Sequence, residues 1–360
     1  MQRSHEIDAL RGLAVIGVLL AHFRGLAPVD WAIYDWFRFE AGVALFFAIS
    51  GAVISATLIP RLVDGAPKRV LAGFYIRRVF RIFPLAFLWL ALGIAGTMLF
   101  NANGSFGDLR ANLFGAAAAA LNFANIAQAK IIIHGMGMFG AYWSLSLEEQ
   151  FYLVFPLFLV LVPARFRLAA IGAVLLLLAA MWRKSAGSYT LLDAFAIDPI
   201  LCGIAAYMVA PRIAARVPVG RVLFFALLVM LLAVPMRILG SGVAYTVVGL
   251  LCGAIVLLAL AGKGWAPDPA GVLSWVGRRS YGLYLAHGPC IAATLELQLP
   301  VAMRIAVWLV LTFGITELLY RFVELPLIAQ GKRRAQAIES RTEKTDNNDA
   351  ELALTPRSSA

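Results

Sequence analysis

The first long apolar segment of the chain carries side chains that could do acid–base or ion-pairing chemistry. Arg11 and His22 are eleven residues apart, a helical rotation of about 1100°, so they lie roughly 20° apart on one face. Asp8 lies one turn before Arg11 and shares that face. The rise from Arg11 to His22 is about 16.5 Å. The segment therefore predicts an ion pair at one end and an imidazole near the other. The alternative is an arginine that extends to the membrane surface and a histidine that faces lipid headgroups.

Two further segments place charged groups on apolar helices. Glu148 and Glu149 come where an apolar helix begins, and because neighbours point about 100° apart we expect only one of them to face the interior. Their alternative role is to stabilise a helix N-terminus. Arg78 and Arg81 are one turn apart on one face, which suits a polyanion such as a phosphate. Simple anchoring at the membrane surface is the alternative for these arginines.

A second histidine, His287, lies within SYGLYLAHGP, with Tyr281 and Tyr284 one or two turns before it. An imidazole, with a pKa of about 6.5, can accept a proton at neutral pH. Only His22 shares a face with Arg11. We therefore expect His22 to be the base and His287 to be secondary.

Membrane-spanning helices must position these groups. Hydrophobic residues make up 61% of the chain, against about 45–50% in soluble domains, and charged residues make up 14%, against about 25%. The apolar runs are continuous and do not alternate as the strands of a lipid-spanning barrel would. We expect an all-α, polytopic integral membrane bundle.

Eleven segments are long enough to cross roughly 30 Å of hydrocarbon: 7–23, 41–60, 82–100, 111–127, 145–162, 168–182, 195–210, 221–238, 243–261, 280–296 and 302–323. Lys and Arg gather in the loops that should be cytoplasmic, and an even number of spans must separate two such loops. The segment 111–127 breaks this parity and holds three Asn, so we expect it to lie on the outer side without crossing. It would then bring Asn122, Asn125 and His134 near Glu148 and His22. The prediction is about ten spans in the inner (plasma) membrane, with both termini cytoplasmic.

The tail, the charge balance and the cysteines narrow the class of protein further. We expect residues 1–330 to form one membrane domain and residues 331–360 a disordered cytoplasmic tail, because the tail is polar and mixed in charge. The 31 Lys and Arg against 20 Asp and Glu are typical of positive-inside loops and not of a nucleic-acid-binding domain. The cysteines fit no metal site. We expect neither nucleic acid nor a metal as partner.

Taken in order, these motifs resemble the acyltransferase-3 family of bacterial integral-membrane O-acyltransferases, which modify sugars of surface polysaccharides, lipopolysaccharide and related glycoconjugates. The resemblance runs from Asp8 to about Pro326. The matching motifs are the Arg11–His22 pair, GVALFFAISGAVI with Ser50, RRVFRIFP, WSLSLEEQFYLVFP, SYGLYLAHGP and FVELP. The chain resembles the stand-alone form of the family, which has no appended esterase-like domain.

The resemblance implies an acyl-CoA donor, usually acetyl-CoA, that enters from the cytoplasm, and a hydroxyl acceptor on a glycan or glycolipid. On this basis we expect the catalytic residues to be His22, Glu148, Arg11 and Asp8. The donor phosphates would bind Arg11, Arg78 and Arg81. Substrate contacts would come from Trp143, Ser144, Tyr152, Tyr281 and His287.

The position of Glu148 gives a further expectation. Because the segment with Glu148 starts on the outer side, Glu148 should lie at the depth of His22.

The alternative function is a secondary transporter or a flippase for a lipid-linked sugar, which would also carry intramembrane charges. Such a protein typically has two related halves, and we see none in this sequence.

Overall fold

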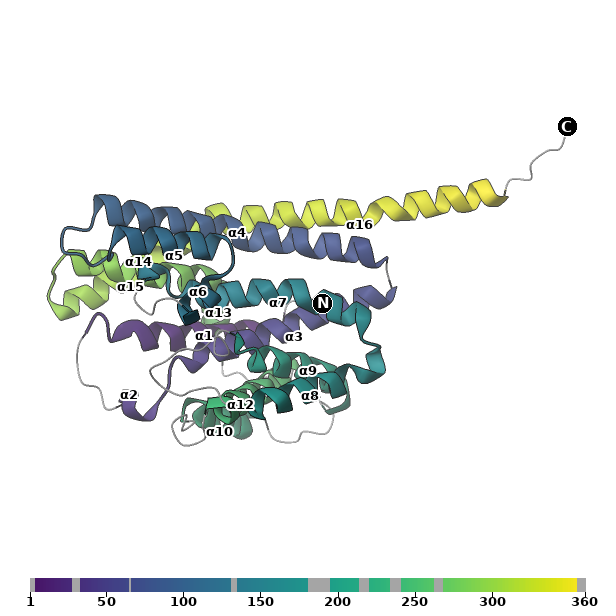
Figure 1. Ribbon diagram of the computed structural model, residues 1–360, viewed down its shortest axis with the longest axis horizontal. Coiled ribbons are helices and arrows are strands. Elements are labelled where there is room, and N and C mark those ends of the chain that lie inside the picture. Colours follow the sequence, from purple (N-terminus) through teal and green to yellow (C-terminus); the bar gives the residue numbers. More distant parts are fainter. Residues whose placement is uncertain are drawn as a thin grey trace.

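A computed structural model describes residues 4–27, 33–64, 66–130, 135–180, 195–213, 220–233, 241–261 and 268–354. In these ranges the chain is helical throughout, without a strand, which confirms the all-α class (Figure 1). The helices are α1 His5–Phe23, α2 Ile33–Trp36, α3 Ala41–Asp64, α4 Pro67–Leu99, α5 Leu109–Ala120, α6 Ala124–Lys130, α7 Tyr142–Leu161, α8 Arg167–Ala180, α9 Asp198–Ile213, α10 Arg221–Leu232, α12 Ser241–Leu260, α13 Val272–Arg278, α14 Ser280–Glu296, α15 Val301–Leu319 and α16 Leu325–Leu354. Short 3-10 turns at Gly137–Phe139 and Ala164–Phe166 and a π-helical turn at Tyr320–Glu324 complete the described elements.

Several helices are long and apolar enough to cross a membrane. Within the described ranges these are α3, α4, α7, α12 and the continuous stretch from α15 into α16. The chain is therefore a helical membrane protein, as its composition predicts. The expected spans 168–182 and 221–238 both end in residues outside the described ranges. The ten-span topology and the cytoplasmic termini stay predictions.

The expected non-crossing segment 111–127 does not form one continuous helix. The structure divides it into α5 and α6, with a turn at Asn122, whose φ of 57° is left-handed. At 1.5 Å per residue α5 is about 18 Å long, well short of a hydrocarbon core of about 30 Å. Asn112 holds α5 against its surroundings, since its side-chain amide donates to Thr97 Oγ1 at 2.8 Å. Neither α5 nor α6 is long enough to cross by itself, and the placement of the segment on the outer side stays a prediction.

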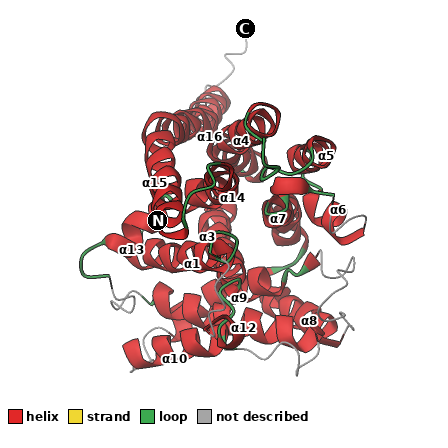
Figure 2. Ribbon diagram, turned by 90° about the vertical axis from the view of Figure 1, so that its left-hand side faces the viewer, coloured by secondary structure: helices red, strands yellow, loops and turns green. Residues whose placement is uncertain are grey.

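Helices α1 and α3 lie at the centre of the bundle (Figure 2). On one side lie α8, α9, α10 and α12, and on the other α4, α14, α15 and α16. The central helices approach their neighbours at glycines, because only a residue without a side chain lets two backbones come this close. A Cβ on Gly42 would meet the Ala14 carbonyl, and one on Gly203 would meet the Ala48 carbonyl. The first contact sets α1, which carries Arg11 and His22, against α3, and the second sets α3 against α9.

A glycine contact also sets the spacing of α1 and α13, which gives a stability prediction. A Cβ on Gly277 would collide with the Asp8 carbonyl oxygen of α1. We expect Gly277→Ala to lower the melting temperature, because overpacking costs about 1–3 kcal/mol. The matched control is Gly314→Ala in α15, where no atom lies within 4 Å. Thermal unfolding in nanodiscs checks both, and a Gly277→Ala protein as stable as the control would contradict this packing.

The expectation of a disordered tail is wrong for residues 331–340. Helix α16 continues through this segment and lies along α4 (Figure 1). The Arg334 guanidinium lies 5.0 Å from the Phe80 ring centroid, and the Glu339 carboxylate pairs with Arg77 at 2.8 Å and Arg61 at 3.2 Å. Ala335 is fully buried between these contacts. Composition predicts disorder here, but helical spacing places the small residues and Glu339 against α4.

Candidate functional site

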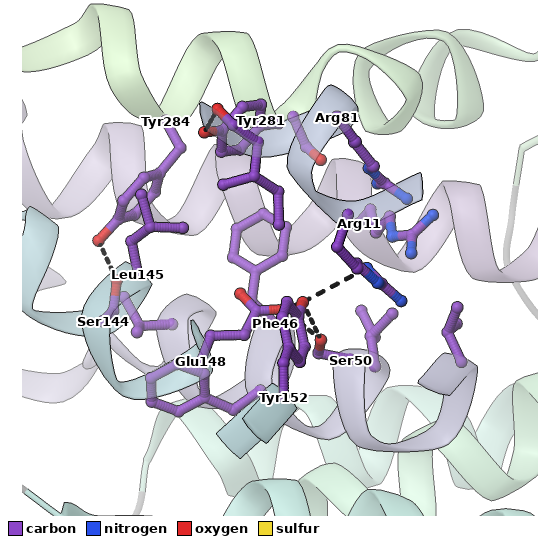
Figure 3. A pocket seen from close by; sticks show the side chains of 17 residues that line it. Arg11, Phe46, Ser50, Arg81, Ser144, Leu145, Glu148, Tyr152, Tyr281 and Tyr284 are labelled. Atoms are coloured by element: carbon purple, nitrogen blue, oxygen red, sulfur yellow. Dashed lines mark hydrogen bonds between the residues drawn. The ribbon is translucent and has the colours of Figure 1, made fainter. Parts of the chain in front are cut away.

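A pocket lined by three arginines lies between α1, α3, α4, α7 and α14. We call it the arginine pocket; its polar lining residues are Arg11, Ser50, Arg78, Arg81, Ser144, Glu148, Tyr152, Ser280, Tyr281 and Tyr284 (Figure 3). The three arginines come from α1 and from one face of α4, as the spacing predicts. Their charge is only partly balanced within the pocket, so an anion is the ligand that this lining favours.

Neighbouring groups orient two of the pocket's arginines, Arg11 and Arg78. Arg11 Nη1 donates to Asp8 Oδ1 at 3.4 Å, and Asp8 is buried, so the expected pair at this end of α1 is present. Arg78 Nη1 donates to the Tyr152 hydroxyl at 3.4 Å, and its guanidinium lies 4.7 Å from the centroid of that ring. Arg77 points away from the pocket to Glu339.

Glu148 lies in the arginine pocket, where it accepts hydrogen bonds from the Ser50 and Tyr152 hydroxyls. The expectation that it lies at the depth of His22 is not met, because His22 lines a different pocket. The reason is that α7 begins at Tyr142, six residues before Glu148, which places the carboxylate about 9 Å along the helix.

Its neighbour Glu149 is also inside the bundle. Only 8% of its surface is exposed, and its Oε1 atom has no hydrogen-bond partner in the described part of the chain. The expectation that one of the two carboxylates faces water or headgroups is therefore wrong. At the turn that carries these carboxylates, α7 is packed on more than one side, although Leu153 and Val154 further along it are exposed.

A second, larger pocket contains His22. We call it the histidine pocket; its polar and aromatic lining residues are His22, Arg38, Glu40, Phe47, Asn125, Gln128, Trp143, Tyr245 and Tyr284. Its cavity is about 520 Å³, against about 100 Å³ for the arginine pocket. Asn125 lines this pocket as expected, Asn122 does not, and His134 lies outside the described residues. Amides, a tryptophan and a charged rim are groups that suit a polyhydroxylated ligand.

His22 and His287 meet beside this pocket. The ring centroids of His22 and His287 are 4.8 Å apart. Nδ1 of His22 is 2.9 Å from the Val18 carbonyl oxygen, and Nδ1 of His287 is 2.5 Å from that of Tyr284. A carbonyl only accepts, so the neutral rings carry their proton on Nδ1 and leave Nε2 free to act as a base. The sequence separates these histidines, but the packing of α14 against α1 brings them together.

The expected substrate residues divide between the pockets. Trp143 lines the histidine pocket, while Ser144, Tyr152 and Tyr281 line the arginine pocket. Sequence reasoning did not assign a role to Ser50 or Tyr284. Tyr284 lines both pockets, and its hydroxyl donates to the Ala141 carbonyl at 2.8 Å. Its position one turn before His287 was the available signal.

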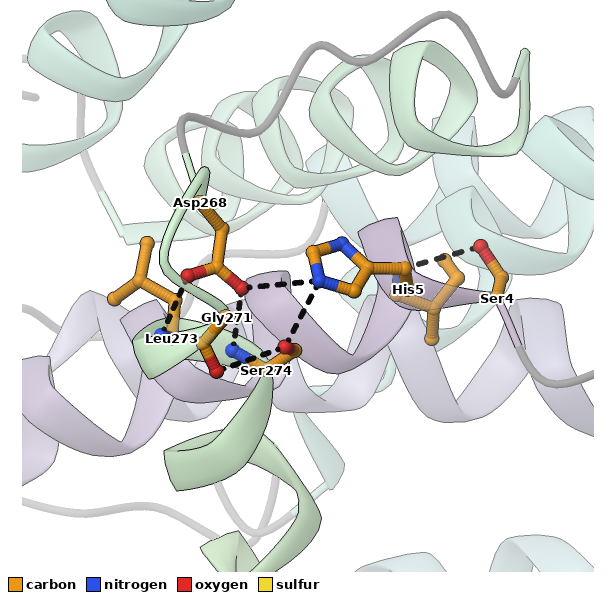
Figure 4. Close-up of polar contacts among 7 residues, drawn as sticks. Ser4, His5, Asp268, Gly271, Leu273 and Ser274 are labelled. Carbon is orange, nitrogen blue, oxygen red and sulfur yellow. Dashed lines mark hydrogen bonds and ion pairs between the residues drawn. The ribbon is translucent and has the colours of Figure 1, made fainter.

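A separate Ser–His–Asp cluster joins the start of α1 to α13 (Figure 4). His5 Nε2 is 3.0 Å from Ser274 Oγ and 3.4 Å from Asp268 Oδ2. Both partners contact the same ring nitrogen, whereas a catalytic triad orients the base through the other one. Asp268 also accepts the backbone N–H groups of Leu273 and Ser274, which makes it a cap of α13.

This cap predicts a pH dependence of stability. Burial acts to raise the pKa of Asp268, but hydrogen bonds from Ser274 and Leu273 and the nearby His5 outweigh it and lower the pKa below its ordinary value. Such a carboxylate stabilises the fold above about pH 3.9 and loses this contribution as the pH falls further. We expect the melting temperature of Asp268→Asn to be lower than that of the wild type at about pH 6. The two melting temperatures should become similar near about pH 3. A difference in melting temperature that stays constant over this range would contradict the cap.

The fold and these pockets define a helical membrane protein with an arginine-lined pocket beside a pocket that contains a histidine. Residues 4–318 match the model of the acyltransferase-3 family, an acyltransferase domain, and the chain belongs to this family.

Similar curated proteins include YrhL of Bacillus subtilis, a candidate peptidoglycan O-acetyltransferase, which is 27% identical over 91% of this chain and 55% of its own length. The peptidoglycan O-acetyltransferase OatA of Listeria monocytogenes is 29% identical over 91% of this chain and 56% of its own length. The O-acetyltransferase OatA of Staphylococcus aureus is 25% identical over 90% of this chain and 57% of its own length. The chain thus spans little more than half the length of these relatives. No solved structure matches it.

Proposed function

We propose that this protein transfers an acetyl group from cytoplasmic acetyl-CoA to a hydroxyl of a cell-envelope glycan. The observation that carries the proposal is that a cationic pocket and a pocket with a free imidazole nitrogen adjoin within one bundle. Family membership supports the acyl transfer, and the names of the relatives support a glycan acceptor such as peptidoglycan.

The arginine pocket is the proposed donor site. Coenzyme A carries several phosphate groups, and a guanidinium binds a phosphate through paired hydrogen bonds. Arg78 and Arg81 lie one turn apart on α4, and Arg11 faces them from α1. Asp8 orients Arg11, and Glu148 holds Tyr152 and Ser50 in place. In this proposal both carboxylates position other groups.

The histidine pocket is the proposed acceptor site. Nε2 of His22 removes the proton of the glycan hydroxyl while its oxygen attacks the thioester carbonyl. The carbon–sulfur bond then breaks, and the imidazolium returns the proton to the CoA thiolate, so that an ester and a thiol are formed. Trp143 offers an apolar face to the sugar, and Asn125 and Gln128 offer amide groups to its hydroxyls. His287 positions the His22 ring.

The proposed topology assigns the donor and the acceptor to opposite sides of the membrane. With ten spans and both termini in the cytoplasm, the first helix begins in the cytoplasm, so Arg11 lies near the inner surface and His22 near the outer one. The protein would then lie in the plasma membrane, with the donor entering from the inside and the glycan from the outside.

A deletion strain tests the proposed function. We expect its envelope glycans to lose base-labile acetyl esters and to regain them with the wild-type gene, but not with a His22→Ala gene that gives equal amounts of membrane protein. Quantification of released acetate checks this in each purified glycan fraction. An unchanged acetate content in every fraction of the deletion strain would contradict the proposal.

A further inference from the structure

The arginine pocket and the histidine pocket share three lining residues. They are Val43 and Phe47, one turn apart on α3, and Tyr284 from α14. Residues that line both pockets form the boundary where the two spaces meet. We call these three side chains the junction.

Packing and hydrogen bonds hold the junction at a fixed size. Phe47 is 3% exposed, and its ring packs edge-on against Trp143 with centroids 5.8 Å apart. The Tyr284 hydroxyl donates to the Ala141 carbonyl and lies 2.7 Å from Ser144 Oγ. The ring of Tyr284 also packs edge-on against Phe46. Aromatic rings that pack on one another around the buried Phe47 yield little to a larger ligand.

The junction lies where the reacting groups must meet. In Figure 3, Tyr284 and Ser144 lie at the opposite end of the arginine pocket from Arg11 and Arg81. A donor held by its phosphates at the arginines therefore extends toward the junction, and His22 lies on the other side of it. The attacking oxygen and the thioester carbon must approach to about 3–3.5 Å. The acyl group consequently sits between Val43, Phe47 and Tyr284.

We propose that Val43 and Phe47 select the length of the acyl chain, admitting a two-carbon group and excluding longer ones. This inference rests on the proposed function and adds the determinant of donor choice. A longer chain would have to extend past the thioester carbon into the space that these two side chains fill. The fixed junction would then prevent the carbonyl from reaching the hydroxyl beside His22. Smaller side chains at these positions would open that space.

The test compares acetyl-CoA with butanoyl-CoA as donor for the purified protein in nanodiscs, with envelope glycan of the deletion strain as acceptor. The variants are Val43→Ala and Phe47→Leu. The matched control for Val43→Ala is Val53→Ala, which carries the same change on α3 but lines only the arginine pocket. The control for Phe47→Leu is Phe155→Leu in α7, a buried position that lines neither pocket. Because both donors are measured on one sample, the ratio of their kcat/KM values is independent of the folded fraction.

We expect the butanoyl-to-acetyl ratio to rise by about tenfold or more in both junction variants, since one or two methylenes in an apolar site discriminate about 10–200-fold. The ratio in the controls should stay near that of the wild type. An unchanged ratio in the junction variants, or an equal rise in the controls, overturns the assignment of the junction. Absence of transfer from either donor by the wild-type protein overturns the proposed function instead.

Discussion

Replacement of His22 by alanine is expected to lower acetyl transfer by about 10²–10⁴-fold, because the variant lacks the base that takes the proton from the attacking hydroxyl. The Nδ1 contact with Val18 is local to α1, so the bundle should still assemble. Acceptor-dependent release of CoA thiol measures the rate. His5→Ala is the matched control, since His5 lies in the cap of α13 and outside both pockets.

The variant His287→Ala tests whether His287 positions His22 or serves only the fold. It is 2% exposed and contacts His22 only through ring packing, so His287→Ala should lower kcat by less than His22→Ala and change the pH profile of kcat. A purely structural role would lower the amount of folded protein and leave that profile unchanged. If His22→Ala transferred acetyl groups at the wild-type rate, His22 would not be the base.

Removal of a donor-site arginine is the second large effect. We expect Arg78→Ala and Arg81→Ala each to raise the KM for acetyl-CoA by about 10–100-fold, because a hydrogen bond to a charged group contributes about 1.5–3 kcal/mol. The KM for the glycan should not change. Lysine at either position should rescue only part of the loss, since it offers a single charge in place of a planar fork.

Arg77→Ala is the matched control for these two variants. Arg77 lies beside Arg78 in the sequence, yet it pairs with Glu339 of α16 and does not line the arginine pocket. Its removal should reduce stability and leave the KM for acetyl-CoA near the wild-type value. If all three alanine variants bound the donor equally well, Arg78 and Arg81 would be ordinary membrane-surface anchors.

Helical spacing was enough to predict part of this site. It placed Asp8 with Arg11, separated Arg11 from His22 along α1, and put Arg78 and Arg81 on one face. These are relations within single helices, which depend only on 3.6 residues per turn.

The features that were missed depend on where helices begin and how they pack. Glu148 lies deeper than expected because α7 starts at Tyr142, and Glu149 is buried because α7 is packed on more than one side at that turn. The contact of His287 with His22 and the place of Tyr284 at the junction arise from the packing of α14 against α1 and α7. No spacing within one segment encodes such contacts.

The most direct test of the central claim uses the purified chain in nanodiscs, acetyl-CoA with a radiolabelled acetyl group, and envelope glycan extracted from the deletion strain. We predict base-labile label on the glycan, one CoA thiol released for each ester formed, and loss of both with His22→Ala. Label that stays entirely on CoA, together with movement of a lipid-linked sugar across liposomes that contain the protein, would contradict acyl transfer and favour the transporter alternative.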